Sequence, residues 1–143
     1  MKDDLEALVA AAKQVRARAY APYSRYRVGA ALRTKAGHVY VGCNVENSTF
    51  GATICAERSA VAAMVSAGDR DPVACVVVTA GPQPGSPCGI CRQVLSEFAP
   101  DMKVVMIAED PSGKEVGRKS ARLSALLPLA FRLEKAPRRR ASK

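Results

Sequence analysis

The chain has 143 residues, and 48% of them are hydrophobic, which is enough for one buried core without disulfide support. No apolar run approaches the roughly 18–20 residues that cross a bilayer, and the amphipathic N-terminus does not resemble an export signal, so we expect a soluble, cytoplasmic protein. Of the net charge of +9, the residues from Arg132 onward supply +5, and we interpret residues 134–143 as a basic tail that keeps the protein soluble and does not bind nucleic acid.

Hydrophobic periodicity and turn residues predict helices alternating with strands over residues 1–133, which we expect to form one domain. In the first half of the chain the predicted elements are a helix over 4–19, a break at Pro22, strands over 26–33 and 38–44 around a hairpin turn, a polar loop over 44–53, and a helix over 54–67 ended by Gly68. A buried strand over 73–79, a loop over 81–87, a helix over 88–98 and a buried strand over 103–108 follow. The chain then continues with a turn over 110–113, a short strand, and a short helix over 123–127. This alternation predicts an α/β fold with helices on both faces of one sheet.

Five cysteines, an odd number, argue against a disulfide framework in a chain expected in the cytoplasm. Cys55 begins one predicted helix, and Cys88 and Cys91 form a Cys-x-x-Cys pair at the start of another. Thiolates are zinc ligands, and the free N–H groups of a helix N-terminus stabilise them. Three sulfurs leave the fourth zinc position to water, which is the arrangement of a catalytic site.

The other cysteines and the histidine are weaker candidates for a fourth ligand. His38 is the only histidine and sits where a turn meets a strand, so we expect it on the surface. We expect Cys43 and Cys75 to be small buried hydrophobic residues. Cys43 is the better spare ligand of the two, because it precedes the loop that begins at Asn44.

Glu57 follows Cys55 by two residues, a spacing that does not place both side chains on one helix face. We therefore expect the Glu57 carboxylate to reach a water held by the metal and to move its proton, without binding the metal itself. An isolated glutamate in a first helical turn would only compensate the helix dipole, so the catalytic interpretation of Glu57 depends on the neighbouring Cys55.

Cys-x-Glu followed by Pro-Cys-x-x-Cys is the signature of zinc-dependent deaminases of nucleobases. The chain resembles the small homotetrameric cytidine deaminases from about residue 5 to 133, in segments 23–24, 28–31, 42–47, 53–58, 86–89, 91–95 and 126–128. The resemblance implies a three-layer α/β/α fold with a central mixed sheet of about five strands. It also implies one Zn²⁺ per subunit on Cys55, Cys88 and Cys91, with Glu57 as the proton shuttle.

Four further residues take substrate-binding roles from the resemblance. It implies that Asn44 and Glu46 bind the ribose hydroxyls and that the backbone N–H of Ala56 lies near the pyrimidine O2. Tyr26 stands where the family usually has a phenylalanine that packs on the nucleoside. Asn44 and Glu46 could instead merely form a turn, and Tyr26 could be a core aromatic.

Phe50 and Phe131 match aromatic positions that help to complete a neighbouring subunit's site in the family, so the resemblance implies a homotetramer. Either residue could also be a core aromatic. Arg58 follows Glu57 directly, and we expect its guanidinium to donate hydrogen bonds to the cysteine sulfurs. Three thiolates on one Zn²⁺ carry a net charge of −1, and Arg58 would offset it; the alternative is an ordinary surface charge.

The function expected from these residues is zinc-dependent hydrolysis of cytidine and 2′-deoxycytidine to uridine and 2′-deoxyuridine, with release of ammonia, in pyrimidine salvage. The substrate is a small nucleoside, and no organic cofactor, membrane or nucleic-acid partner is expected. Tyr26, Arg27 and Ile90 depart from the family pattern, so the preferred nucleoside stays open.

Three alternatives remain. The first is a relative acting on an N4-modified cytidine or on a nucleoside antibiotic such as blasticidin S, and a panel of substrates would distinguish it from a cytidine deaminase. A polynucleotide-editing deaminase would need a basic groove with interleaved aromatic residues near the site. A structural zinc module would need a fourth protein ligand and would have no use for Glu57.

Overall fold

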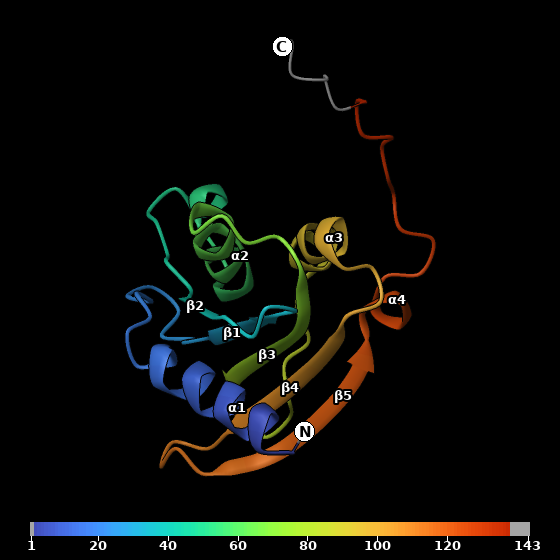
Figure 1. Cartoon of the computed structure of the whole chain (residues 1–143). Coiled ribbons are helices and arrows are strands. Elements are labelled where there is room, and N and C mark those ends of the chain that lie inside the picture. The colour runs from blue at the N-terminus through green and yellow to red at the C-terminus, as the bar shows by residue number, and fades with distance from the viewer. Residues whose placement is uncertain (1, 138–143) are drawn as a thin grey trace.

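The structure is a computed structural model and describes residues 2–137. One mixed sheet of five strands runs in the order β2-β1-β3-β4-β5, in which β3 and β4 are parallel and the other neighbours are antiparallel. The strands are β1 (Gly29–Thr34), β2 (Val39–Cys43), β3 (Pro72–Ala80), β4 (Lys103–Glu109) and β5 (Glu115–Arg122). Figure 1 shows this sheet with helices on both faces.

Among the helices of the described residues, α1 (Lys2–Arg16) alone covers one face of the sheet. Its apolar stripe packs on alternate residues of the central strands, with Val76 and Val78 of β3 turned toward it. The buried cluster is Leu8, Val9, Ala12, Ala31, Ala74, Val76, Val78, Val105 and Ile107. Close approach is possible because Gly29 has no side chain: a β-carbon there would lie 2.1 Å from the carbonyl oxygen of Ala12.

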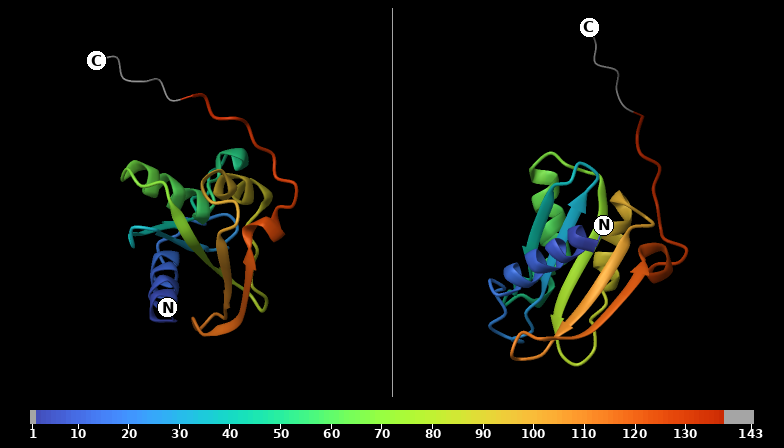
Figure 2. Two further views of the ribbon diagram at one scale, coloured as in Figure 1. Left: turned by 45° about the vertical axis from the view of Figure 1, so that its right-hand side comes forward. Right: turned by 60° about the horizontal axis from the view of Figure 1, so that its bottom comes forward.

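The opposite face carries α2 (Ala56–Ser66), α3 (Gly89–Phe98) and the short α4 (Leu123–Leu126), as two further views show (Figure 2). The intervening residues of β3, Cys75 and Val77, point to this side and pack with Met64 of α2 and Leu95 of α3. Residues that alternate between two buried faces are what a central strand requires. The predicted three-layer α/β/α fold with a five-stranded mixed sheet is therefore confirmed.

The first predicted helix is wrong at its C-terminal end, because α1 stops at Arg16 and not at residue 19. Tyr20 leaves the helix to form a bridge with Val45, in which its N–H donates to the Asn44 carbonyl and its carbonyl accepts from Glu46. A backbone that pairs with another segment cannot also continue the i to i−4 pattern of a helix. Ala19 is still buried, so the apolar pattern correctly indicates burial, but it extends beyond the last residue of the helix.

The strand expected over 26–33 is wrong at its start, because β1 begins at Gly29. Tyr26 and Val28 belong to a loop in which the side chain of Asn44 occupies their backbone groups. The remaining predicted helices and strands agree with the structure to within one or two residues at each end. Gly37 and Gly68, which end the hairpin turn and follow α2, both have positive φ angles, of 89° and 87°.

None of the helices within residues 2–137 is long and apolar enough to cross a bilayer. Of the predicted tail, residues 134–137 are exposed and lie outside helices and strands, and residues 138–143 lie outside the described part of the chain.

Candidate active site

The three predicted zinc ligands come together at the N-termini of α2 and α3. Cys55 is the N-cap residue of α2, Cys88 is the N-cap residue of α3, and Cys91 follows one turn later. Their Sγ atoms all lie within 4.8 Å of one another, and those of Cys55 and Cys88 are 3.9 Å apart. Tetrahedral zinc with sulfur at ~2.3 Å requires sulfurs about 3.8 Å apart, so the cluster fits the ion that the sequence predicts.

Two thiols of this cluster, those of Cys55 and Cys91, have pKa values that are shifted in opposite directions. The pKa of Cys55 is lowered to about 5, mainly by a hydrogen bond from Cys91 and further by Arg58. The same hydrogen bond, together with burial, raises the pKa of Cys91. Neither α2 nor α3 has a side-chain cap, so the first N–H groups of both helices stay available to the sulfurs. The environment therefore favours a thiolate at Cys55, the state in which cysteine binds metals.

Arg58 lies where the sequence prediction needs it. Its Nη2 donates to Sγ of Cys55 at 3.7 Å and to the carbonyl oxygen of Thr53 at 3.1 Å. The Nε atom is buried and has no hydrogen-bond partner among the described residues. The guanidinium is thus fixed beside the sulfurs and is not a solvated surface charge.

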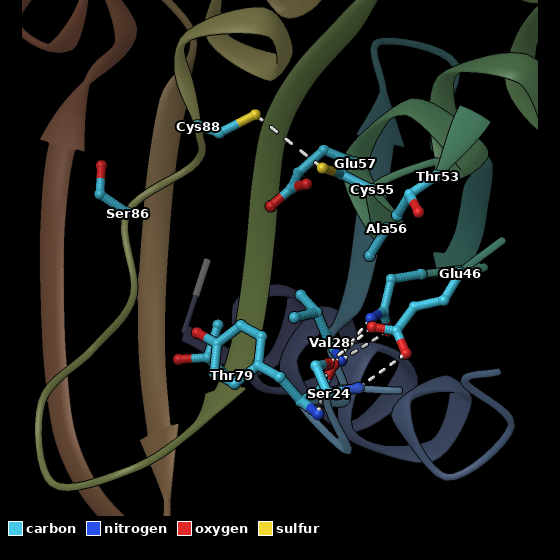
Figure 3. A pocket seen from close by; sticks show the side chains of 12 residues that line it. Ser24, Val28, Glu46, Thr53, Cys55, Ala56, Glu57, Thr79, Ser86 and Cys88 are labelled. Carbon is cyan, nitrogen blue, oxygen red and sulfur yellow. Dashed lines mark hydrogen bonds between the residues drawn. The ribbon is translucent and has the colours of Figure 1, made fainter. Parts of the chain in front are cut away.

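Glu57 points into the same space from the first turn of α2, beside Cys55 and Cys88 in Figure 3. Only 4% of the residue is exposed, and this burial raises the pKa of its carboxyl group. A carboxyl group whose pKa is raised above its usual range holds a proton more readily and can donate it as well as accept it. The Cys75 thiol lies deeper in the core, where burial and the charge of Glu57 raise its pKa.

A pocket of about 250 Å³ connects the cysteine cluster to the loop before β1 and the loop after β2. Tyr26 and Ala56, which were both expected to contact the substrate, line this pocket. Figure 3 shows Cys55, Glu57 and Cys88 at one end of the pocket and Ser24, Val28 and Glu46 toward the other. Its full lining is Ser24, Tyr26, Val28, Asn44, Glu46, Thr53, Cys55, Ala56, Glu57, Thr79, Ser86 and Cys88.

Asn44 and Glu46 also line the pocket, and both already hold the backbone of the loop before β1. Asn44 Oδ1 accepts from the N–H of Val28 at 2.9 Å, and its Nδ2 donates to the carbonyl of Tyr26 at 2.7 Å. Glu46 accepts three hydrogen bonds from Tyr23 and Ser24, and those from Ser24 and then Tyr23 lower its pKa. The two side chains therefore fix the pocket wall, and the Glu46 carboxylate keeps lone pairs for a further donor.

The remaining candidates lie apart from the pocket within this single chain. Phe50 and Phe131 are 76% and 68% exposed and do not line it. His38 is exposed, as predicted, and pairs with Asp69. Cys43 is only half-buried, so the prediction of a buried residue there was too strong. Neither residue belongs to the cysteine cluster found among the described residues.

Sequence reasoning missed several residues that shape the pocket. Thr79 is buried at the end of β3, and its Oγ1 accepts from the N–H of Gly85 at 3.0 Å. Arg92 donates to the carbonyl of Pro87 and to Oγ of Ser86, which holds the segment that carries Cys88. Arg92 and Ser86 stood inside matched motifs, whereas Thr79 ended an apolar strand with no pattern to single it out.

Comparison with known proteins gives one consistent family. The family described as the cytidine and deoxycytidylate deaminase zinc-binding region matches residues 2–108. A cytidine deaminase of Halalkalibacterium halodurans is 45% identical over 132 residues, which cover 92% of this chain and 96% of that protein. One of Mycobacterium tuberculosis is 41% identical over 129 residues, 90% of each chain. The crystal structure of cytidine deaminase from Burkholderia pseudomallei superposes with a TM-score of 0.79 at 43% identity, over 88% of this chain and 98% of that one.

Proposed function

Because the chain belongs to the cytidine and deoxycytidylate deaminase family, we propose that the pocket beside Cys55, Glu57 and Cys88 is where cytidine and 2′-deoxycytidine are deaminated. The reaction is zinc-dependent hydrolysis of the C4 amino group, which yields the uridine nucleoside and ammonia and belongs to pyrimidine salvage. The observation that carries the assignment of residues is the buried Glu57 carboxyl at the same helix N-terminus as the three-sulfur cluster.

The metal site consists of Cys55, Cys88 and Cys91, and bound zinc supplies Lewis-acid activation of the attacking water. The described residues offer no fourth ligand in this cluster, which leaves a position for water. A purely structural site would fill all four positions with protein groups. The arrangement thus supports catalysis over a structural zinc module.

Glu57 performs the proton transfers of the reaction. Its carboxylate takes a proton from the attacking water and gives it to N3 of the cytosine ring. It then takes the remaining proton of the oxygen added at C4 and delivers it to the C4 amine, so that ammonia leaves as the C4 carbonyl forms. Positioned acid–base transfer of this kind contributes roughly 10²–10⁴-fold to a rate. Burial supports this role, because it raises the pKa of the Glu57 carboxyl and so makes the protonated form accessible.

The nucleoside is held by groups around the pocket. The backbone N–H of Ala56, at the first position of α2, has no partner within the helix, which supports its role as a donor to the pyrimidine O2. Tyr26 contributes an aromatic wall, and Asn44 and Glu46 take the ribose hydroxyls with their remaining hydrogen-bonding capacity.

The working protein is a homotetramer in the cytoplasm. Phe50 and Phe131 support this assembly, because two large aromatic side chains are left largely exposed in a single chain. Free thiols in a zinc site fit a reducing compartment. Residues 1–133 form the catalytic domain, and residues 134–143 are a tail without a part in nucleoside turnover.

A panel of substrates tests this function. Ammonia release is measured with the zinc-loaded protein on cytosine, cytidine, 2′-deoxycytidine, N4-methylcytidine, blasticidin S, cytidine monophosphate and a cytosine-containing oligonucleotide. We expect cytidine and 2′-deoxycytidine to have the highest kcat/KM, by about tenfold or more, because the pocket is small and ends in groups suited to a sugar. A higher kcat/KM on blasticidin S or on the oligonucleotide would replace this function with one of the alternatives.

A further inference from the structure

Gly85 lies in the loop between β3 and α3, directly before the segment Ser86-Pro87-Cys88. A β-carbon at this position would lie 2.9 Å from the phenol oxygen of Tyr26, 2.9 Å from Cγ2 of Thr79 and 3.0 Å from Oγ1 of Thr79. The two distances of 2.9 Å are too short for a β-carbon, and the third is at the limit of a tight contact. The Tyr26 hydroxyl and Thr79 therefore occupy the space that any side chain at residue 85 would need.

This constraint differs from that at Gly29 and Gly42, where a β-carbon would meet other atoms at still shorter distances. A β-carbon at Gly29 or Gly42 would meet backbone atoms of a covering helix, at 2.1 Å and 2.3 Å, which is a requirement of packing in the core. At Gly85 the obstruction comes from the ends of two side chains, and both belong to the lining of the substrate pocket. The absence of a side chain at residue 85 is thus linked to the shape of the pocket.

Of these two side chains, Thr79 is the fixed one. It is 3% exposed, its Oγ1 accepts from the N–H of Gly85, and the same hydroxyl donates to the carbonyl of Ile107 at 3.3 Å. Tyr26 is 44% exposed, and its hydroxyl has no hydrogen-bond partner among the described residues. A side chain added at residue 85 would therefore displace the Tyr26 ring before it displaced Thr79.

We propose that Gly85 is a positioning residue for substrate binding: with Thr79 it forms a notch that leaves room for the Tyr26 hydroxyl and so allows the Tyr26 ring to lie along the pocket wall. Figure 3 shows Thr79 on the side of the pocket away from Thr53 and Glu46. The ring in this position thereby sets the width of the pocket between its metal-binding end and Asn44. This inference rests on the proposed function, since the pocket is taken as the nucleoside site.

A double-mutant cycle between residues 85 and 26 tests the notch. In Gly85→Ala the affinity for the product uridine, measured by calorimetry, should fall about tenfold, and KM for cytidine should rise in parallel with little change in kcat. Tyr26→Phe alone should change uridine affinity by less than about threefold, because the hydroxyl it removes makes no hydrogen bond. In Tyr26→Phe/Gly85→Ala the loss should be at least about threefold smaller than in Gly85→Ala.

Rescue by Tyr26→Phe is partial because Cγ2 of Thr79 still faces the new methyl group. Thr79→Ser removes Cγ2 and keeps the hydroxyl that bonds Gly85 and Ile107, so adding it should extend the rescue. Gly51→Ala is the matched control, since a β-carbon there meets nothing within 4 Å and should leave uridine affinity unchanged. Melting temperature and zinc content are recorded for each variant, to separate a displaced ring from a damaged fold.

An equal loss of uridine affinity from Gly85→Ala, whether residue 26 is Tyr or Phe, would overturn the proposal, because the loop and not the tyrosine would then carry the effect. No effect of Gly85→Ala on uridine affinity would overturn it as well. Failure of the proposed function is a separate result: the wild-type protein would then neither bind uridine nor release ammonia from cytidine.

Discussion

Nη2 of Arg58 lies 3.7 Å from Sγ of Cys55, three residues earlier at the N-terminus of α2. The guanidinium is a positive charge held beside a cluster of three sulfurs, and it helps to lower the pKa of Cys55 to about 5. A positive charge at this place offsets the net −1 of three thiolates on one Zn²⁺.

Arg58→Gln should keep some zinc and slow turnover on cytidine by about 10–100-fold, the usual loss when a partner of a metal ligand is removed. Arg58 lowers the pKa of Cys55, so its removal raises that pKa. Protons compete with zinc for the thiolate, and the pH of half-maximal zinc uptake should therefore shift upward. Zinc content across pH and steady-state rates measure both effects. Arg70→Gln, which removes an exposed arginine beyond the other end of α2, is the control. Unchanged rates and zinc uptake in Arg58→Gln would show that the helix dipoles alone offset the negative charge of the thiolates.

The sequence predicted the metal cluster and its surroundings well, because the required residues sit next to one another in the chain. Cys55, Glu57 and Arg58 share one helix N-terminus, and Cys88 and Cys91 share another, so helix boundaries were enough to place them. Likewise, the apolar run in β3 predicted a strand buried on both faces.

The pocket wall could not be predicted in the same way, because it depends on contacts between distant segments. Asn44 was expected to face the sugar, yet its amide also forms hydrogen bonds with the backbone of Tyr26 and Val28. From the sequence alone, residues 26–28 were expected to be the start of a strand. Thr79 and Gly85 meet Tyr26 across more than 50 residues of chain, and only the packed fold shows that they share space.

Cys88→Ala should lose both zinc and activity, because two sulfurs hold the ion far more weakly than three. Metal analysis after dialysis against a mild chelator measures the loss. Cys43→Ala is the matched control: it removes a half-buried thiol outside the cluster and should retain one zinc per chain. A Cys88→Ala protein with full zinc would refute this ligand set.

The protein should behave in solution as a particle of about 60 kDa, four times the chain mass of 15.1 kDa. Phe131 is 68% exposed in the single chain, so burying it between subunits should stabilise the assembly. Phe131→Asp should shift light scattering toward smaller species and lower activity at low protein concentration, whereas Phe131→Leu should retain the assembly. A fully active wild-type monomer under dilute conditions would contradict the tetramer.

Removing residues 136–143 should leave kcat and KM for cytidine almost unchanged. Residues 136–137 are exposed, outside helices and strands, and the segment is rich in Arg and Lys, a composition that does not build a core. Steady-state kinetics of the shortened protein test this, with zinc content as the check on folding. A large drop in turnover would mean that the tail takes part in the site.

We propose that Glu57 moves the protons of the reaction while three cysteines hold the zinc. The direct measurement is ammonia release from cytidine by the wild-type protein and by Glu57→Ala, each brought to one zinc per chain and checked by circular dichroism. Glu57→Ala should keep its zinc and its fold and lose nearly all turnover, at least about 10²-fold, since Glu46, the other carboxylate among the described pocket residues, lies away from the cysteine cluster. A Glu57→Ala protein that deaminates cytidine at the wild-type rate would contradict the mechanism.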